Sequence, residues 1–464
     1  MIEVKEKTLK PLLNEAYQTI REGTTARLVS ITERIDAVDP FSVFEHAKHI
    51  ANNRFFWSSV AEEFYLVGVG ETKSFQATED VYNQIEKQWT ELIEQSIIYN
   101  DDRQGGTGPV AFGGFPFDQK EQLKGAWKDF TGSQFSIPTY LVVRNKASYY
   151  LTINVMIEPT DQIDELHEKV EKQIDELLSV LHLDQTQALV DKREEGNPSQ
   201  WIELVEKAMK KIKQGEVAKV VLAREMNIYF QSNPIITLAL QQLAATQTSS
   251  FIFAYEQGGA CFVGATPERL VRVEQEQLFS ACIAGTAPRG KTESEDQRIA
   301  NALLHDHKNR EEHDYVVQMI KEAVSNSCTA VDIPDNPIIY SLKNLQHLYT
   351  PVTAKLKSNY TILDVVKYLH PTPALGGLPR EASMAFIRSF EPIERGWYGA
   401  PIGWFDTYQN GEFAVAIRSG LIRNKQATLF AGCGIVKESD PVAEYEETLI
   451  KFTPMLDALE VDNE

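Results

Sequence analysis

Residues 260–275 read "ACFVGATPERLVRVEQ", two runs of β-type residues that are separated by Pro267 and Glu268. Valine, phenylalanine and leucine favour strands, whereas a proline has no N–H to donate to a strand ladder. We therefore expect two strands with an interruption or bulge at Pro267. Taken alone, Glu268 is more typical of an exposed turn, although bulges also recur beside active sites.

Runs of this kind dominate the chain from about residue 197 to its C-terminus, and they decide the predicted fold class. Helices are expected at about 296–325 and 441–457. Strands in series with few strand–helix–strand alternations favour an α+β fold over a doubly wound sheet. The other β-type runs are "KVVLAREMNIYF" (219–230), "FIFAYEQ" (251–257), "QLFSACIAGTA" (277–287), "GAPIGWFD" (399–406), "FAVAIRSGLIRN" (413–424) and "ATLFAGCGIV" (427–436).

The first part of the chain, residues 1–195, mixes strands and helices. A polar segment, "LVDKREEGNPSQ" (189–200), is typical of a domain boundary and precedes a predicted amphipathic helix that begins near Pro198. Residues 196–464 would then form a second part of the chain. In the first part we expect two strands in 55–70, a strand in 107–118 that ends in a glycine turn, a hairpin in 139–157 and a helix over 160–181.

Composition narrows the class of protein. The 464 residues carry a net charge of −20 and are 43% hydrophobic, which is typical of a globular protein and shows no basic footprint for nucleic acid. Four scattered cysteines do not form a zinc pair or a disulfide framework. The sequence has neither a signal-peptide pattern nor an apolar run of membrane-spanning length, so we expect a soluble cytoplasmic protein. Phosphate-binding glycine motifs are also absent.

Lys219 lies at the start of an apolar run, "AKVVLAR" (218–224), and two readings are open. Its amine could reach water while its stem covers apolar surface. Alternatively, the amine could be half-buried, where desolvation lowers its pKa and makes it a base. The residues around it do not choose between these readings.

Two predicted helices each carry a pair of oxygen ligands. Glu444 and Glu447 are three residues apart with Lys451 on the same face, and Asn309 and Glu312 show the same spacing. A solvated helix face is the commoner explanation of one such pair. Two pairs together indicate a Mg²⁺ site, because Mg²⁺ prefers a few carboxylates plus water and substrate oxygens. Zinc is not favoured, since His305, His307 and His313 are poorly spaced for one helical face.

Small-residue loops could bring backbone N–H groups close to an anion. They include "IAGTAPRG" (283–290), "HPTPALGG" (370–377) and "AGCGIV" (431–436), although ordinary turns remain the default reading. Arg418 is expected within the apolar strand that contains "AIRSG". An arginine in such a strand needs a carboxylate partner, from the protein or from a substrate.

Taken together, these segments resemble the chorismate-utilising enzyme family. The match covers roughly residues 197–457, and the pieces occur in family order. It implies that residues 196–464 are the chorismate-binding catalytic region. The resemblance implies one large fold in which two sheets pack face to face with helices outside, so that both sequence halves form one unit. The matching pieces are "KVVLAR", "GATPERL", "IAGTAPRG", "NREEHDYVV", "HPTPALGG", "GAPIGWFD", "AIRSG", "AGCGIV" and "AEYEETLIKF".

The resemblance also assigns roles to residues and implies a Mg²⁺ cofactor. Glu312 and Glu447 match the family's metal ligands, and Glu444 matches a carboxylate beside them. The groups expected to hold the carboxylates of chorismate are Gly285, Thr286, Arg418, Gly432, Gly434 and Lys451.

Two positions separate the branches of the family. Nitrogen-using members carry glutamine where this chain has Lys219, and one branch has a lysine nucleophile where this chain has Ala284. The combination resembles the water-using branch, with Lys219 as general base and Glu268 as general acid. No glutamine amidotransferase partner is then expected. The expected activity is isochorismate synthase, with menaquinone synthesis as the favoured pathway. The alternatives are salicylate synthase and, more remotely, a non-catalytic ligand-binding protein.

Overall fold

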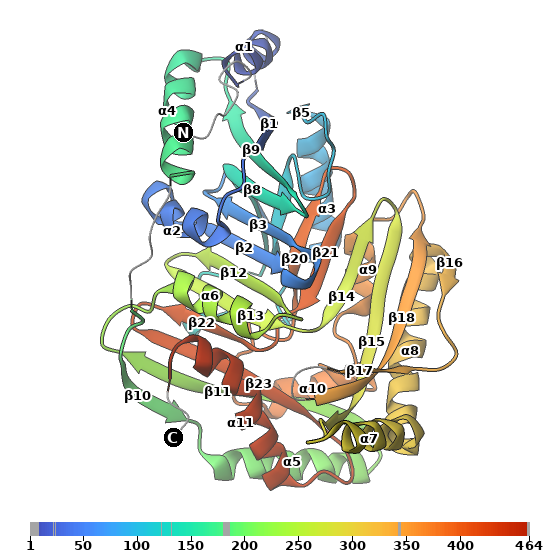
Figure 1. Ribbon diagram of the computed structural model, residues 1–464. Helices are drawn as coiled ribbons and strands as arrows, with labels where there is room; N and C mark the ends of the chain where they lie inside the picture. The colour runs from blue at the N-terminus through green and yellow to red at the C-terminus, as the bar shows by residue number, and fades with distance from the viewer. Residues whose placement is uncertain are drawn as a thin grey trace.

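The computed structural model describes residues 9–21, 23, 25–121, 123–130, 132–179, 186–341 and 345–461, without the side chains of Lys308 and Glu312. Two large sheets pack against each other, and helices cover their outer faces (Figure 1). This is the predicted α+β arrangement. None of the helices in these residue ranges is long and apolar enough to cross a membrane.

The larger sheet has thirteen strands among the described residues, and the one parallel pair among them is β1 with β5. Strands from both sides of residue 195 contribute to it. In order across the sheet they are β10 (Val190–Glu195), β11 (Lys219–Phe230), β23 (Gln426–Ile435), β22 (Ser419–Arg423), β13 (Ala260–Thr266), β12 (Phe251–Gln257), β2 (Arg54–Ser59), β3 (Phe64–Val69), β8 (Tyr140–Asn145), β9 (Ser148–Ile157), β1 (Arg27–Ile35) and β5 (Ile97–Tyr99), while β19 (Gly377–Leu378) pairs with the start of β11.

The smaller sheet has ten antiparallel strands within the described ranges, and it also combines both halves of the chain. The division into a first part and a catalytic region therefore does not follow the sheets. In order its strands are β16 (Cys328–Asp332), β18 (Leu345–Leu356), β15 (Gln277–Pro288), β14 (Arg269–Glu274), β21 (Gly411–Val415), β20 (Pro401–Asp406), β6 (Val110–Gly114), β7 (Ser133–Ile137) and β4 (Lys73–Ala77), while β17 (Ile338–Ser341) pairs with β18.

Helices pack on the outer faces through apolar stripes. The larger sheet is covered by α1 (Leu9–Ile20), α2 (Pro40–Ile50), α4 (Ile163–Leu177), α6 (Ile236–Thr246) and α11 (Pro441–Ala458). The remaining helices and short 3₁₀ turns are α3 (Val81–Glu94), α5 (Pro198–Lys213), α7 (Glu293–His305), α8 (His307–Ser327), α9 (Ile362–Leu369), α10 (Arg380–Phe390), η1 (Val60–Glu62) and η2 (Gly125–Trp127).

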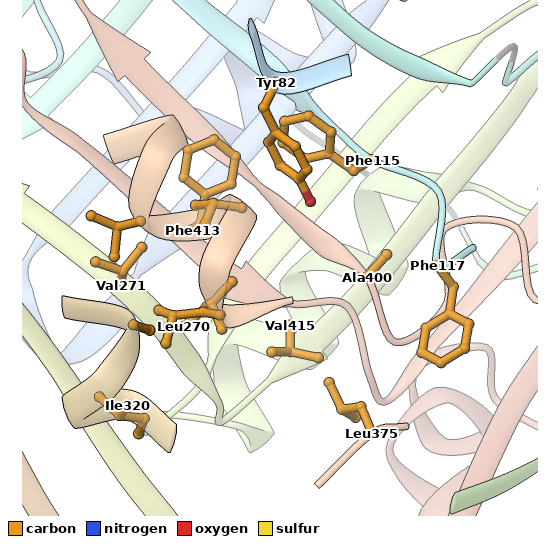
Figure 2. Packing of buried hydrophobic residues seen from close by; sticks show 14 of the residues in the cluster. Tyr82, Phe115, Phe117, Leu270, Val271, Ile320, Leu375, Ala400, Phe413 and Val415 are labelled. Carbon is orange, nitrogen blue, oxygen red and sulfur yellow. The ribbon is translucent and has the colours of Figure 1, made fainter. Parts of the chain in front are cut away.

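The core joins the two sequence halves. Figure 2 shows Tyr82 and Phe115 from the first half beside Phe413 from the second, and the rings of Tyr82 and Phe115 have centroids 4.3 Å apart. All three belong to one cluster that lies between the smaller sheet and its helices. Burial of such aromatic side chains contributes roughly 1.5–3 kcal/mol each, so contacts between the two halves stabilise the fold.

The helix expected at 296–325 is wrong as a single element. The chain breaks at Asp306 into α7 and α8, and the carboxylate of Asp306 caps α8 by accepting a hydrogen bond from N of Asn309 at 2.8 Å. An aspartate at this position satisfies the otherwise unpaired N–H groups of a new helix, which explains the break. The predicted helix after Pro198 is confirmed as α5, with Trp201, Leu204 and Val205 buried.

Candidate active site

Two crossovers between the sheets place Glu268 and Arg418 side by side. The chain leaves the larger sheet at Pro267 and Glu268, between β13 and β14, and returns to it at 416–418, between β21 and β22. N of Val415 donates to O of Glu268 at 3.0 Å, and N of Ala265 donates to O of Arg418 at 3.1 Å. The predicted interruption at Pro267 is confirmed, and it is the passage from one sheet to the other.

Arg418 does not lie within a strand, contrary to the prediction. Its backbone is left-handed, with φ of +51°, and it forms the turn that leads into β22. A non-glycine residue in this conformation is held by its surroundings. The turn directs the guanidinium into the protein, where burial lowers the pKa of Arg418; Tyr398, Glu447 and Glu268 oppose this effect.

Lys219 is the first residue of β11, and only 8% of it is exposed. It pairs with Leu378 of β19 on one edge of the strand, while β23 lies on the other. Its side chain crosses Gly434 so closely that a Cβ atom at position 434 would lie 2.7 Å from Cε of Lys219. Lys219 is therefore packed in the interior and does not extend into solvent.

The carboxyl group of Glu268 lies among cations. Burial raises the pKa of Glu268 to about 7. The positive charges of Arg418, Lys219 and Lys451 partly oppose this rise. Glu268 is consequently close to the base candidate and can carry a proton near neutral pH, as a general acid requires.

The second half of β23 has an open edge in this region. Residues 426–430 pair with β22, whereas 431–435 pair with β11 alone among the described strands. Nζ of Lys451, on α11, donates to O of Gly432 at 2.8 Å across this edge. Because the N–H and C=O of one strand residue point to the same side, and alternate residues repeat that direction, the backbone of Gly434 faces the same opening. The two glycines thus leave backbone groups and space for an anion.

A bulge in β15, in the smaller sheet, also lies near the site, because Arg418 and Lys451 affect the pKa of His347, which pairs with Thr286. The pairing with β18 shifts between Ala284 and Thr286, and Gly285 has φ of +74°. A Cβ atom at position 285 would lie 3.1 Å from Oδ1 of Asn309, so the bulge packs tightly against α8. Nδ1 of His313, a fully buried residue of α8, lies 3.3 Å from O of Ala284 and holds the bulge against this helix.

His347 is a site residue that the sequence did not reveal. Its Nδ1 is 3.0 Å from Oγ1 of Thr286. Burial lowers its pKa to about 4; a backbone hydrogen bond with Gly285 opposes this, and Arg418 and Lys451 reinforce it. Only the pairing of β15 with β18 brings His347 here, and no local pattern in "LQHLYT" predicts it. Tyr398, beside Arg418, was missed for the same reason.

The predicted metal ligands are described in part. Oε1 of Glu447 lies 2.5 Å from Nζ of Lys451, and the side chain of Glu447 is 51% exposed. The backbone O of Glu444 accepts a hydrogen bond from Sγ of Cys433 at 3.7 Å. The exposed carboxylate of Glu447 has free positions for a hard cation that keeps part of its water shell. Glu312 is in α8, and its side chain lies outside the described residues. Among the described residues, no group of three or more His, Cys, Asp and Glu could hold a metal ion.

The tertiary structure thus brings the remaining predicted residues to one place. Glu268 and Arg418 lie at the crossovers, and Lys219 and Lys451 are close enough to affect the pKa of Glu268. Other predicted residues lie on the neighbouring elements. These are Gly285, Thr286, Gly432, Gly434, Glu444 and Glu447. Their chemical roles stay predictions.

Comparison with known proteins finds relatives that match nearly the whole chain. The family model described as "Chorismate binding enzyme" matches residues 14–460. The chain is 40% identical to the isochorismate synthase MenF of Bacillus subtilis over 99% of both chains. It is 32% identical to the salicylate biosynthesis isochorismate synthase of Pseudomonas aeruginosa, over 93% of this chain and 90% of that protein.

A solved structure has the same fold. The menaquinone-specific isochorismate synthase MenF of Escherichia coli superimposes with a TM-score of 0.80, covering 98% of this chain and all of the other, at 24% identity. The family match spans both sheets and all the strands that form the site. This chain is therefore a member of the chorismate-binding enzyme family.

Proposed function

We propose that this protein is an isochorismate synthase, which converts chorismate to isochorismate. The observation that carries the proposal is that Lys219 and Glu268 meet in one cationic site of a chain that resembles isochorismate synthases over its full length. The site lies between the crossovers and the open edge of β23, and its cations suit a dianionic substrate.

The proposed chemistry exchanges one hydroxyl for another. Lys219, in its neutral form, takes a proton from water as the water oxygen bonds to C2 of chorismate. The ring double bonds shift, the C4–O bond breaks, and Glu268 gives its proton to the leaving hydroxyl, which departs as water. Before the next turnover Lys219 must lose a proton and Glu268 must regain one. Positioned acid and base groups typically contribute about 10²–10⁴-fold each.

Other residues would bind and orient the substrate. Arg418 and Lys451 lie beside Glu268, and the backbone groups of Gly432 and Gly434 face the same opening. These donors suit carboxylates, because hydrogen bonds to charged groups are short and strong. Thr286 and His347 would also line the substrate, next to the bulge at Gly285.

We also propose Mg²⁺ as the cofactor, held by Glu312 and Glu447 with Glu444 nearby. The hard oxygen donors and the exposed position of Glu447 at the site fit this ion. When bound, Mg²⁺ would neutralise and orient a substrate carboxylate. Lys451 pairs with Glu447 and would keep its carboxylate directed at the site.

Product analysis tests the proposed function. Purified protein is incubated with chorismate and Mg²⁺, and the products are separated by chromatography beside Lys219→Ala. We expect isochorismate from the wild type and loss of turnover in the variant, which should still bind chorismate in calorimetry. Salicylate with pyruvate would identify a salicylate synthase instead. Near-normal turnover by Lys219→Ala would exclude the assigned base, and no heat of chorismate binding would exclude both enzymes.

The proposed pathway is menaquinone synthesis. One relative bears the name MenF, and the similar solved structure is described as menaquinone-specific. Deletion of the gene should then abolish menaquinone in the source cell. Normal menaquinone with loss of a catechol siderophore would contradict this assignment.

A further inference from the structure

One edge of β11 is interrupted beside the base candidate. β19 pairs with Lys219 and Val220, and β10 pairs with residues 226–230. Between these two partners, no described strand covers the edge that contains O of Val221 and N of Ala223. Buried backbone groups of this kind need hydrogen-bond partners, or the strand would be destabilised.

A buried ion pair takes the place of the missing strand. Nη2 of Arg395 donates to O of Val221 at 2.7 Å, and N of Ala223 donates to Oε2 of Glu391 at 2.8 Å. The two side chains are joined by a bidentate contact, with Nε and Nη2 of Arg395 each 2.6 Å from a carboxylate oxygen of Glu391. Their side chains are 4% and 1% exposed.

Arg395 also connects β11 to the loop that precedes β19. Its Nη1 donates to O of Leu375 at 3.2 Å, and N of Val221 donates to O of Gly376 at 3.3 Å. The guanidinium lies 4.2 Å from the ring centroid of Phe117, a residue of the first sequence half. Three separate chain segments therefore meet on one guanidinium.

The same loop reaches the acid candidate. Thr372 and Ala374 line a cavity of about 20 Å³ together with Glu268. At its other end, Gly377 is so close to β11 that a Cβ atom there would lie 2.2 Å from O of Lys219. The loop thus spans from the strand of Lys219 to the crossover of Glu268, and Arg395 fixes it to that strand.

We propose that Arg395 and Glu391 are positioning residues that set the distance between Lys219 and Glu268. The proposal rests on the proposed function, which assigns the base and the acid. A buried ion pair is often no more stabilising than apolar residues of similar volume, but its bidentate geometry defines position. Neither residue is among the groups expected to bind the carboxylates of chorismate, so their effect should fall on the chemical step.

The test compares Arg395→Lys and Glu391→Gln with the wild type in the isochorismate assay. We expect kcat to fall at least about tenfold in both, since small displacements of catalytic groups can cost about 10²-fold, while KM for chorismate changes less than about threefold. Lysine keeps the positive charge but cannot make the bidentate contact of the guanidinium, so Arg395→Lys should not retain the wild-type kcat. Arg423→Lys is the matched control. Its guanidinium pairs with Asp129, and Arg423 lies across β23 from Tyr229, at the opposite end of β11 from Lys219, so kcat should be unchanged.

The outcomes separate the two proposals. If Lys219→Ala retains turnover, the assigned chemistry fails and the positioning role with it. If Lys219→Ala is inactive but Arg395→Lys and Glu391→Gln both keep kcat within twofold, the positioning role alone is wrong. If Arg395→Lys and Glu391→Gln do not fold, Phe117→Leu can be used instead. It removes the ring that lies against the guanidinium of Arg395 and leaves the ion pair intact. We then expect a smaller fall in kcat at constant KM, and an unchanged kcat would overturn the inference.

Discussion

The side chain of Lys219 passes over Gly434, so that a Cβ atom at position 434 would lie 2.7 Å from Cε and 3.3 Å from Nζ of the lysine. The two residues share one face of the sheet, because Gly434 pairs with Val221, two positions along β11 from Lys219. A glycine at 434 therefore leaves the space through which the amine reaches the site.

Gly434→Ala should lower kcat without unfolding the protein. The added methyl group displaces the flexible end of Lys219, and a misplacement of about 1 Å in a catalytic group can cost about 10²-fold. Steady-state kinetics and thermal unfolding measure the two effects separately. Gly196→Ala is the control, because a Cβ atom there meets nothing within 4 Å. Wild-type kcat in Gly434→Ala would show that the position of Lys219 is not critical.

Gly432→Ala should instead reduce stability. A Cβ atom at 432 would lie 2.4 Å from O of Leu222, a backbone atom of the paired strand that cannot move aside. We expect a loss of about 1–3 kcal/mol in the free energy of unfolding, as for other overpacked sites. Denaturant titration measures it. Stability equal to that of Gly434→Ala would contradict the distinction between a side-chain and a backbone clash.

The activity should fall as the pH rises through about 7. Glu268 must carry a proton to act as acid, and burial raises its pKa to about 7, so the active form is lost above that value. The alkaline limb of kcat/KM reports this pKa in the free enzyme. In Glu268→Gln we expect the loss of most activity with a folded chain, and of this limb from any residual rate. The same limb in the variant would assign it to another group.

Removal of divalent metal should stop the reaction. EDTA should abolish turnover, and added Mg²⁺ should restore it. Glu447→Gln should weaken Mg²⁺ binding in the presence of chorismate by at least about tenfold, as measured by calorimetry. Glu446→Gln, an exposed neighbour on α11, is the matched control. Turnover that is indifferent to EDTA would exclude the proposed Mg²⁺ site.

His347 should act as a neutral hydrogen-bonding group. Burial lowers its pKa to about 4, so its imidazole carries no charge at working pH. His347→Gln keeps a neutral polar side chain next to Thr286 and should be about fivefold to tenfold more active than His347→Leu, since one hydrogen bond to a polar group contributes about 1–1.5 kcal/mol. Equal kinetics in the two variants would indicate that His347 only fills space.

The amino-acid sequence by itself determined the local elements and the chemistry of the family. Side-chain type and spacing predicted the strands on either side of Pro267, the hairpin at 139–157 and the apolar face of α5, because these patterns depend on neighbours along the chain. Lys219 and Glu268 were found through ordered motifs.

Only the tertiary structure decided how those residues meet. The crossovers at Pro267 and Arg418, the break at Asp306 and the arrival of His347 beside Thr286 all depend on pairings between distant segments. Arg418 was predicted in a strand because its neighbours are apolar, yet its left-handed backbone is imposed by the return to the larger sheet. Contacts over long sequence separations leave no local pattern, because the free energy that stabilises them comes from packing and burial of the folded whole.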